Sequence, residues 1–154
     1  MTLGIAPETM ASFFEQYEWT YERSGDDTWY TGFRGDVSSF RIFIKVTEHW
    51  AFFTIAPLVV APKDEECVRK LHWHLLRLNR DINMAKFCLD SDGDVVLTVE
   101  LPTENLDYSE FSDALGALSH YADDTYLEIL NLGQSPNAAS RYDPKEDDLD
   151  WGDN

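Results

Sequence analysis

The chain has 154 residues, and its 12 basic and 29 acidic side chains give a formal charge of -17. This length suits one folded domain, so a second full-sized domain is not expected. Nucleic acids and anionic membranes attract basic surfaces, so the charge argues against both as partners. Because 44% of the residues are hydrophobic, the chain has enough apolar surface to fold despite its charge.

The N-terminus has no basic stretch followed by a long apolar core, and no segment approaches the roughly 18 apolar residues that a membrane span needs. We therefore expect a cytoplasmic protein. Cys67 and Cys88 form no CxxC pair. They are expected to be reduced and to behave mostly as small buried hydrophobic residues.

The spacing of apolar residues changes once in the first half of the chain. Residues 7–19 begin with a proline and repeat apolar side chains at intervals of three and four, which predicts a helix. From residue 28 the period is two, which predicts three short strands, at 29–35, 39–46 and 50–56. Residues 56–62 are apolar but bracketed by prolines, so we expect an extended crossover or a short edge segment there.

The second half begins with the clearest helix, at residues 64–82, which has acids at its start and arginines near its end. Strands at 84–90 and 94–101 flank a Ser-Asp-Gly turn, and Asp107 precedes an amphipathic helix that ends before Gly133. The order α-β-β-β-α-β-β-α predicts an α+β domain with an antiparallel five-stranded sheet packed with helices. We expect this domain to span residues 1–133, and residues 134–154 to form an acidic, mobile tail.

A family resemblance is carried by the run LHWHLLRLNRDINMAKFCLDSDGDVVLTVELP and, after a short gap, by YSEFSDALGALSHYADDTYLEIL. Over roughly residues 10–132, this pattern resembles the YbjN family, whose domains are similar to the type III secretion chaperones. The shared features are a helix ending near Asn79, a strand with Lys86 and Phe87, the turn at Gly93 and a long last helix. The resemblance implies a dimeric, acidic, non-enzymatic module that binds other proteins.

The helix at 64–82 carries the candidate binding residues. At about 100° per residue, most of its apolar side chains form one core-facing stripe. A basic face around a tryptophan lies off that stripe. Because Arg and Trp are enriched at interface centres, this face is the predicted partner or dimer interface. It comprises Arg69, Lys70, Trp73, Leu76, Arg77 and Arg80. The alternative is that Trp73 only packs within its own chain, against arginine stems or under the loop at 56–62.

Aromatic side chains in the three-strand region form a second candidate surface. Not all of them can point inward from strands of period two; they are Trp29, Tyr30, Phe33, Phe43, Phe52 and Phe53. Either helices cover both faces of the sheet, or some aromatics line a groove for a partner segment.

Catalytic and metal-binding signatures are weak. Asp90, Asp92 and Asp94 have calcium-loop spacing, but position twelve would be Leu101, so an ordinary turn is expected. His72 and His74 stand two residues apart on a helix and cannot chelate one ion, so they are interpreted as surface or interface histidines. We expect no catalytic residue, no metal site and no cofactor.

The leading hypothesis is a homodimer, formed through helix 64–82, that acts as a chaperone-like or regulatory adaptor for an unidentified protein client. The alternative is a small-molecule sensor or enzyme with a pocket between sheet and helices. A third possibility is a purely structural subunit of a larger assembly. Fold alone does not decide among them.

Overall fold

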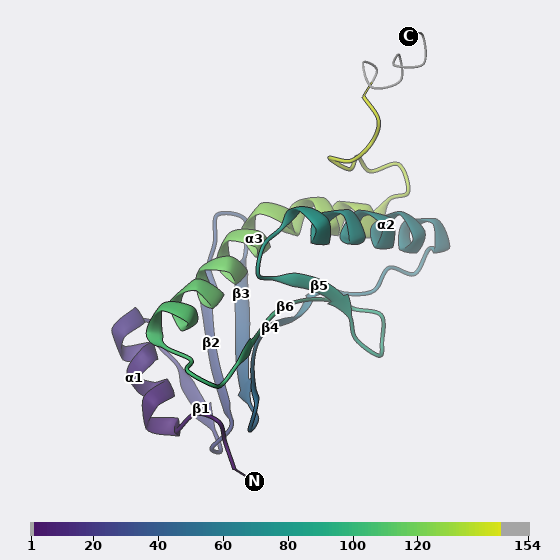
Figure 1. The fold of residues 1–154 in the computed structure, drawn as a ribbon. Coiled ribbons are helices and arrows are strands. Elements are labelled where there is room, and N and C mark those ends of the chain that lie inside the picture. The colour runs from purple at the N-terminus through teal and green to yellow at the C-terminus, as the bar shows by residue number, and fades with distance from the viewer. Residues whose placement is uncertain (1, 146–154) are drawn as a thin grey trace, which may run out of the picture.

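The computed structural model describes residues 2–145, which form one antiparallel sheet with helices against one of its faces (Figure 1). The elements in chain order are α1 (Pro7–Tyr17), β1 (Glu22–Ser24), β2 (Thr28–Arg34), β3 (Ser39–Val46), β4 (Trp50–Val59), α2 (Glu65–Asp81), β5 (Lys86–Leu89), β6 (Val95–Pro102) and α3 (Tyr108–Gln134). The sheet order is β1-β2-β3-β4-β6-β5. The predicted α+β class and antiparallel sheet are confirmed.

The sheet has six strands rather than the five predicted. The additional strand is β1, whose residues are all exposed and pair with β2. A strand is recognised in a sequence by one apolar face, and this polar strand has none. It forms because β2 offers free backbone groups beside it. A short, charged strand at this position also protects the edge of the sheet.

Strand β4 is longer than the sequence predicted. Residues 56–59, assigned to a crossover or edge segment, continue the strand to Val59 after a register shift that begins at Ile55. Pro57 follows a cis peptide bond at this irregularity. Proline in a strand is tolerated at such places because no ladder hydrogen bond from its nitrogen is required.

Aspartates begin the two long helices. Asp64 Oδ1 accepts hydrogen bonds from the backbone N–H groups of Glu66 (2.8 Å) and Cys67 (3.2 Å), so it caps α2 instead of lying within its first turn. Asp107 Oδ1 accepts from Glu110 N at 2.9 Å and caps α3, as predicted. These bonds satisfy N–H groups that have no partner inside the helix.

The core is built around α3, which lies over β4 and β6. Phe111 is fully buried at the centre of an aromatic cluster. Its ring lies 5.0 Å from that of Phe14 and 5.9 Å from that of Phe53, which joins α1, α3 and the sheet. Aromatic pairs at these separations add to the stabilisation from burial alone.

Residues 135–145, the part of the expected tail that the structure describes, are called the C-terminal segment below. They contact α2 and α3 through several side chains. Residues 146–154, the rest of the expected acidic tail, lie outside the described residues. The division into a domain and a mobile tail stays a prediction.

Candidate functional site

The six residues of the predicted basic face all lie on α2, where they divide between two sides of the helix. Lys70 and Trp73 are half-buried beside the C-terminal segment. Leu76 is 71% exposed on the side toward β5. By the helical period, Arg69 and Arg80 lie between these two sides.

On the first side, Trp73 packs within its own chain. Its ring makes an edge contact with Tyr142, with 6.5 Å between centroids. The guanidinium of Arg77 lies over the same ring at 4.9 Å, a separation typical of a cation-π contact. Lys70 Nζ donates to the carbonyl oxygen of Ala138 at 2.8 Å and lies 3.3 Å from a carboxylate oxygen of Asp143. The role of this face in a dimer stays a prediction.

His74 is fully buried beneath the C-terminal segment, contrary to its interpretation as a surface or interface histidine. Its Nδ1 lies 2.7 Å from the hydroxyl oxygen of Ser140. That oxygen also accepts a hydrogen bond from the backbone N–H of Tyr142.

Burial, rather than the charged groups around it, favours the neutral ring of His74. Nε2 lies 3.3 Å from Glu128 Oε1 and makes no hydrogen bond. Glu128 binds Arg141 instead, with Oε1 at 2.7 Å from the guanidinium Nε and Oε2 at 2.6 Å from the backbone N–H. Burial lowers the pKa of His74, and the nearby carboxylate of Glu128 opposes this shift.

Two further side chains anchor the C-terminal segment. The Tyr142 hydroxyl donates to Asp81 Oδ2 at 2.6 Å, and burial together with this bond raises its pKa to about 12. Asp143 accepts a hydrogen bond from the backbone N–H of Ser140 at 2.9 Å, which lowers the pKa of its carboxyl. The segment is thus held to both α2 and α3 by bonds to ionised groups, which are the stronger kind.

On the second side of α2, an apolar groove of about 250 Å³ runs between the helix and edge strand β5. Leu76 and Leu89, which are 71% and 42% exposed, belong to its walls. Next to it, Asn79 bonds both backbone groups of Phe87: its Nδ2 donates to the carbonyl oxygen at 3.0 Å, and its Oδ1 accepts from the N–H at 2.7 Å. The groove therefore has a fixed shape and open, apolar walls.

The strand aromatics divide between the two faces of the sheet. Trp29 and Phe53 are fully buried on the face that the helices cover. Tyr30, Phe43 and Phe52 alternate with these positions and so lie on the opposite face, against which Figure 1 shows no helix in the described part of the chain. The interpretation in which helices cover both faces is wrong.

The carboxylates of Asp90, Asp92 and Asp94 come within 4.8 Å of one another. Asp90 Oδ1 accepts from the backbone N–H groups of both Asp92 and Asp94, and Asp94 Oδ1 accepts from Ala61 N. The first two bonds are typical of a hairpin turn, and the third ties the turn to the segment between β4 and α2. Both cysteines are free; Cys67 is buried as expected, whereas Cys88 is exposed.

The sheet, its strand order and the three helices define the fold of the type III secretion chaperones, as solved structures show. YbjN from E. coli is similar with a TM-score of 0.60 at 14% identity, covering 84% of this chain and 98% of that one. A chain of the ExoU–SpcU complex from the type III secretion system of Pseudomonas aeruginosa has a TM-score of 0.53 at 18% identity, with coverages of 79% and 94%. The Yersinia pestis type III secretion chaperone SycH in complex with a fragment of YscM2 gives 0.51 at 12% identity, with coverages of 75% and 95%.

The chain belongs to the YbjN family, described as "Putative bacterial sensory transduction regulator", whose model matches residues 6–131. The resemblance noted from the sequence is therefore confirmed. No curated protein matches the chain. Among residues 2–145, none of the helices has both the length and the apolar character needed to cross a bilayer.

Proposed function

We propose that this protein is a non-enzymatic, chaperone-like or regulatory adaptor that binds another protein in the cytoplasm and acts as a homodimer through α2. Family membership and the shared fold support this proposal. One of the similar structures is a chaperone bound to a protein fragment, and another is a heterodimeric complex of a secretion system. Since fold alone does not specify function, the surface of α2 has to carry the argument.

The exposed side of α2 is the observation that supports a dimer best. Leu76 is the most exposed of the large hydrophobic side chains on α2, and the groove beside it has almost no polar lining. Contiguous exposed apolar surface of this kind marks interaction sites in soluble proteins. A two-fold dimer brings the same patch of both copies together, so Leu76 of one copy can enter the groove of the other.

The arginines of the predicted interface fit the rim of such a dimer. Arg69 and Arg80 lie beside Leu76 on the helix surface and are exposed. Acidic residues begin α2 at Glu65 and Glu66, and Asp81 ends it. At the rim of a dimer, these arginines can meet acidic residues of the other copy outside the apolar centre.

The oligomeric state tests the proposal. Leu76→Asp places a charge in the proposed interface and should convert a dimer at micromolar concentration into a monomer in analytical ultracentrifugation. Leu127→Asp is the matched control, because Leu127 is 49% exposed on α3, away from the groove, and should leave the dimer intact. A monomeric wild type, or a dimeric Leu76→Asp variant, contradicts the proposal.

Trp73→Asp is a less specific test of the same interface. Trp73 packs against Tyr142 and Arg77, so this substitution also disturbs the C-terminal segment. A monomeric or insoluble Trp73→Asp variant is still expected. Only the Leu76 variant separates a lost interface from a disturbed fold.

A further inference from the structure

The sheet face opposite the helices has a charge unlike that of the rest of the protein. The pairing register aligns Glu22, Tyr30, Phe43, Thr54, Thr98 and Lys86 in one row across it. The outward positions of the strands hold four basic residues and two acidic ones. The basic residues are Arg34, Arg41, Lys45 and Lys86, and the acidic residues are Glu22 and Glu100. The face is therefore net positive, although the whole chain carries -17.

Three of these cations are available to a ligand. Lys86 Nζ lies 3.1 Å from Glu100 Oε1, so its charge is already balanced. Among residues 2–145, no carboxylate lies within ion-pair distance of Arg34, Arg41 or Lys45. All three side chains are exposed. An acidic group approaching this face would find three unbalanced cations.

Strand β3 carries two of these cations, with an aromatic ring between them. Arg41, Phe43 and Lys45 occupy alternate positions and point to the same side. Since a strand rises about 3.3 Å per residue, the two cations stand roughly 13 Å apart with the ring halfway. Tyr30 and Phe52 flank Phe43 and Lys45 on the neighbouring strands and widen the apolar strip.

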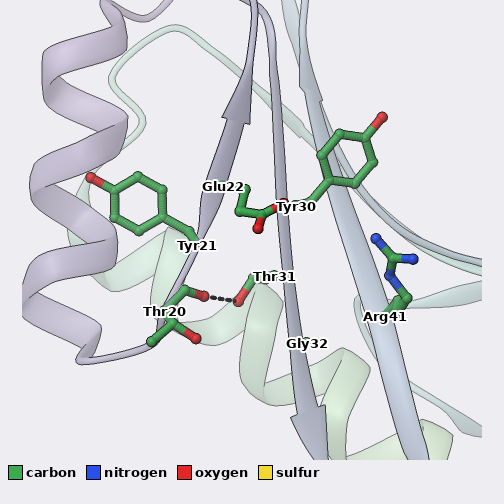
Figure 2. A pocket seen from close by; sticks show the side chains of 7 residues that line it. All are labelled: Thr20, Tyr21, Glu22, Tyr30, Thr31, Gly32 and Arg41. Carbon is green, nitrogen blue, oxygen red and sulfur yellow. Dashed lines mark hydrogen bonds between the residues drawn. The ribbon is translucent and has the colours of Figure 1, made fainter.

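A hollow of about 350 Å³ lies at the β1 end of this strip. Figure 2 shows Tyr30 and Arg41 on the same side of strands β2 and β3 at its border, whereas Tyr21 lies on the other side of β1. Gly32 leaves the space open because it has no side chain. A Cβ at this position would also meet the carbonyl oxygen of Phe40 at 2.8 Å, so the close pairing of β2 and β3 keeps this residue small.

We infer that this face binds an extended acidic segment of a partner protein, with Asp or Glu at two positions four residues apart and an apolar or aromatic side chain midway between them. An extended segment presents every second side chain to one surface at the spacing of Arg41, Phe43 and Lys45. The inference rests on the proposed protein-binding function and adds the chemistry of the client. It does not involve α2.

Nucleic acid fits this face less well. It carries one negative charge per nucleotide, and affinity grows with the number of basic groups that neutralise them. Three unbalanced cations on a protein of charge -17 are too few for that, and the acids elsewhere repel a long polyanion. A segment with two carboxylates matches the two cations of β3, Arg41 and Lys45, one to one.

A labelled peptide tests the inference. The probe is a nine-residue Ser/Gly peptide with Phe at its centre and Glu two residues to either side, and binding to the full chain is measured by fluorescence anisotropy. We expect saturable binding that weakens at high ionic strength. Replacing both Glu residues of the peptide by Gln, or the Phe by Ser, should weaken it by about tenfold or more, which is about 1.4 kcal/mol.

A pair of charge-reversal variants locates the site. Arg41→Glu combined with Lys45→Glu should weaken binding about tenfold or more. As a comparison matched in charge, Arg41→Glu alone should weaken binding, whereas Lys63→Glu, at an exposed lysine outside both the sheet and α2, should leave it unchanged. These two single reversals change the total charge equally. Circular dichroism confirms the fold of each variant, and Arg41→Gln with Lys45→Gln should give an intermediate loss.

Several results would overturn the inference: no saturable binding, equal binding of the Gln peptide, or equal losses in the Arg41→Glu and Lys63→Glu variants. Tighter binding of single-stranded poly-uridine, lost in the Arg41/Lys45 variant, would identify a nucleic-acid surface instead. Ultracentrifugation of the same proteins reads out the α2 dimer separately. Failure of the peptide test and failure of the dimer are therefore distinguishable.

Discussion

Two sides of α2 differ in what covers them. The C-terminal segment lies against Trp73 and Lys70, whereas Leu76, three residues further on, is 71% exposed. Trp73 is the larger apolar side chain, yet it is the one that the chain shields. The exposure of side chains on α2 thus depends on where the C-terminal segment packs. The side that this segment leaves uncovered is available to another molecule.

The same substitution on opposite sides of the helix should give the largest contrast. Leu71 lies on the core-facing side of α2 and is fully buried. Leu71→Ala should therefore lower the free energy of unfolding by about 2–5 kcal/mol through lost contacts and a residual cavity. Leu76→Ala should change the free energy of unfolding of the monomer by less than about 0.5 kcal/mol. Urea unfolding of both variants, at a concentration where the protein is monomeric, measures the difference. Similar losses would mean that α2 has no free side.

A smaller effect is expected when pH falls and His74 takes up a proton. The groups that face it are Ser140, Arg141 and Asp143 from the C-terminal segment, Glu128 from α3 and Lys70 from α2. Because burial lowers the pKa of His74 in the folded protein, the unfolded chain binds more protons below about pH 6.5. Stability from the neutral ring is therefore present above that pH and is lost as pH falls toward the folded pKa.

The His74→Gln variant isolates this contribution from the many carboxylates. The difference in unfolding free energy between wild type and His74→Gln should shrink as pH is lowered from neutral, whereas the exposed His120→Gln control should track the wild type. Urea titrations at a series of pH values provide the measurement. A constant difference across the series would show that His74 does not titrate with folding.

The smallest predicted effect concerns a single hydroxyl. Tyr142→Phe removes the bond to Asp81 but keeps the ring that covers Trp73. The loss should be about 0.5–1.5 kcal/mol, the usual net value of one hydrogen bond. Thermal unfolding measures it, and the tryptophan emission maximum should stay in place because Trp73 remains covered. A red shift would show that the hydroxyl, and not the ring, holds the segment down.

Periodicity predicted α2 and its buried stripe, because the apolar side chains of an amphipathic helix that face the core recur at the helical period. The same arithmetic places His74 about 20° outside that stripe, next to Cys67 and Leu78. This was a usable sign of burial. Metal-ligand spacing, which compares only His72 with His74, does not reveal it.

Other parts of the structure leave no local trace in the sequence. Strand β1 pairs through its backbone alone, and its side chains would suit any loop. Tyr142 covers Trp73 from a region whose composition predicts a tail. The basic charge of the open sheet face is distributed over three strands, so it emerges only when the register is known. Such features depend on contacts between residues far apart in the chain.

Asn79 has a consequence for how large an assembly of this protein can become. Its amide makes both hydrogen bonds that a further strand would make with Phe87 on edge strand β5. An unpaired edge is a template on which sheets grow from molecule to molecule without limit, and a side chain that occupies it blocks this growth. At Phe87, a molecule that meets this edge can therefore associate only through side chains. Assemblies of this chain at that edge should stay finite and soluble, and replacing Asn79 by Leu should favour fibre formation.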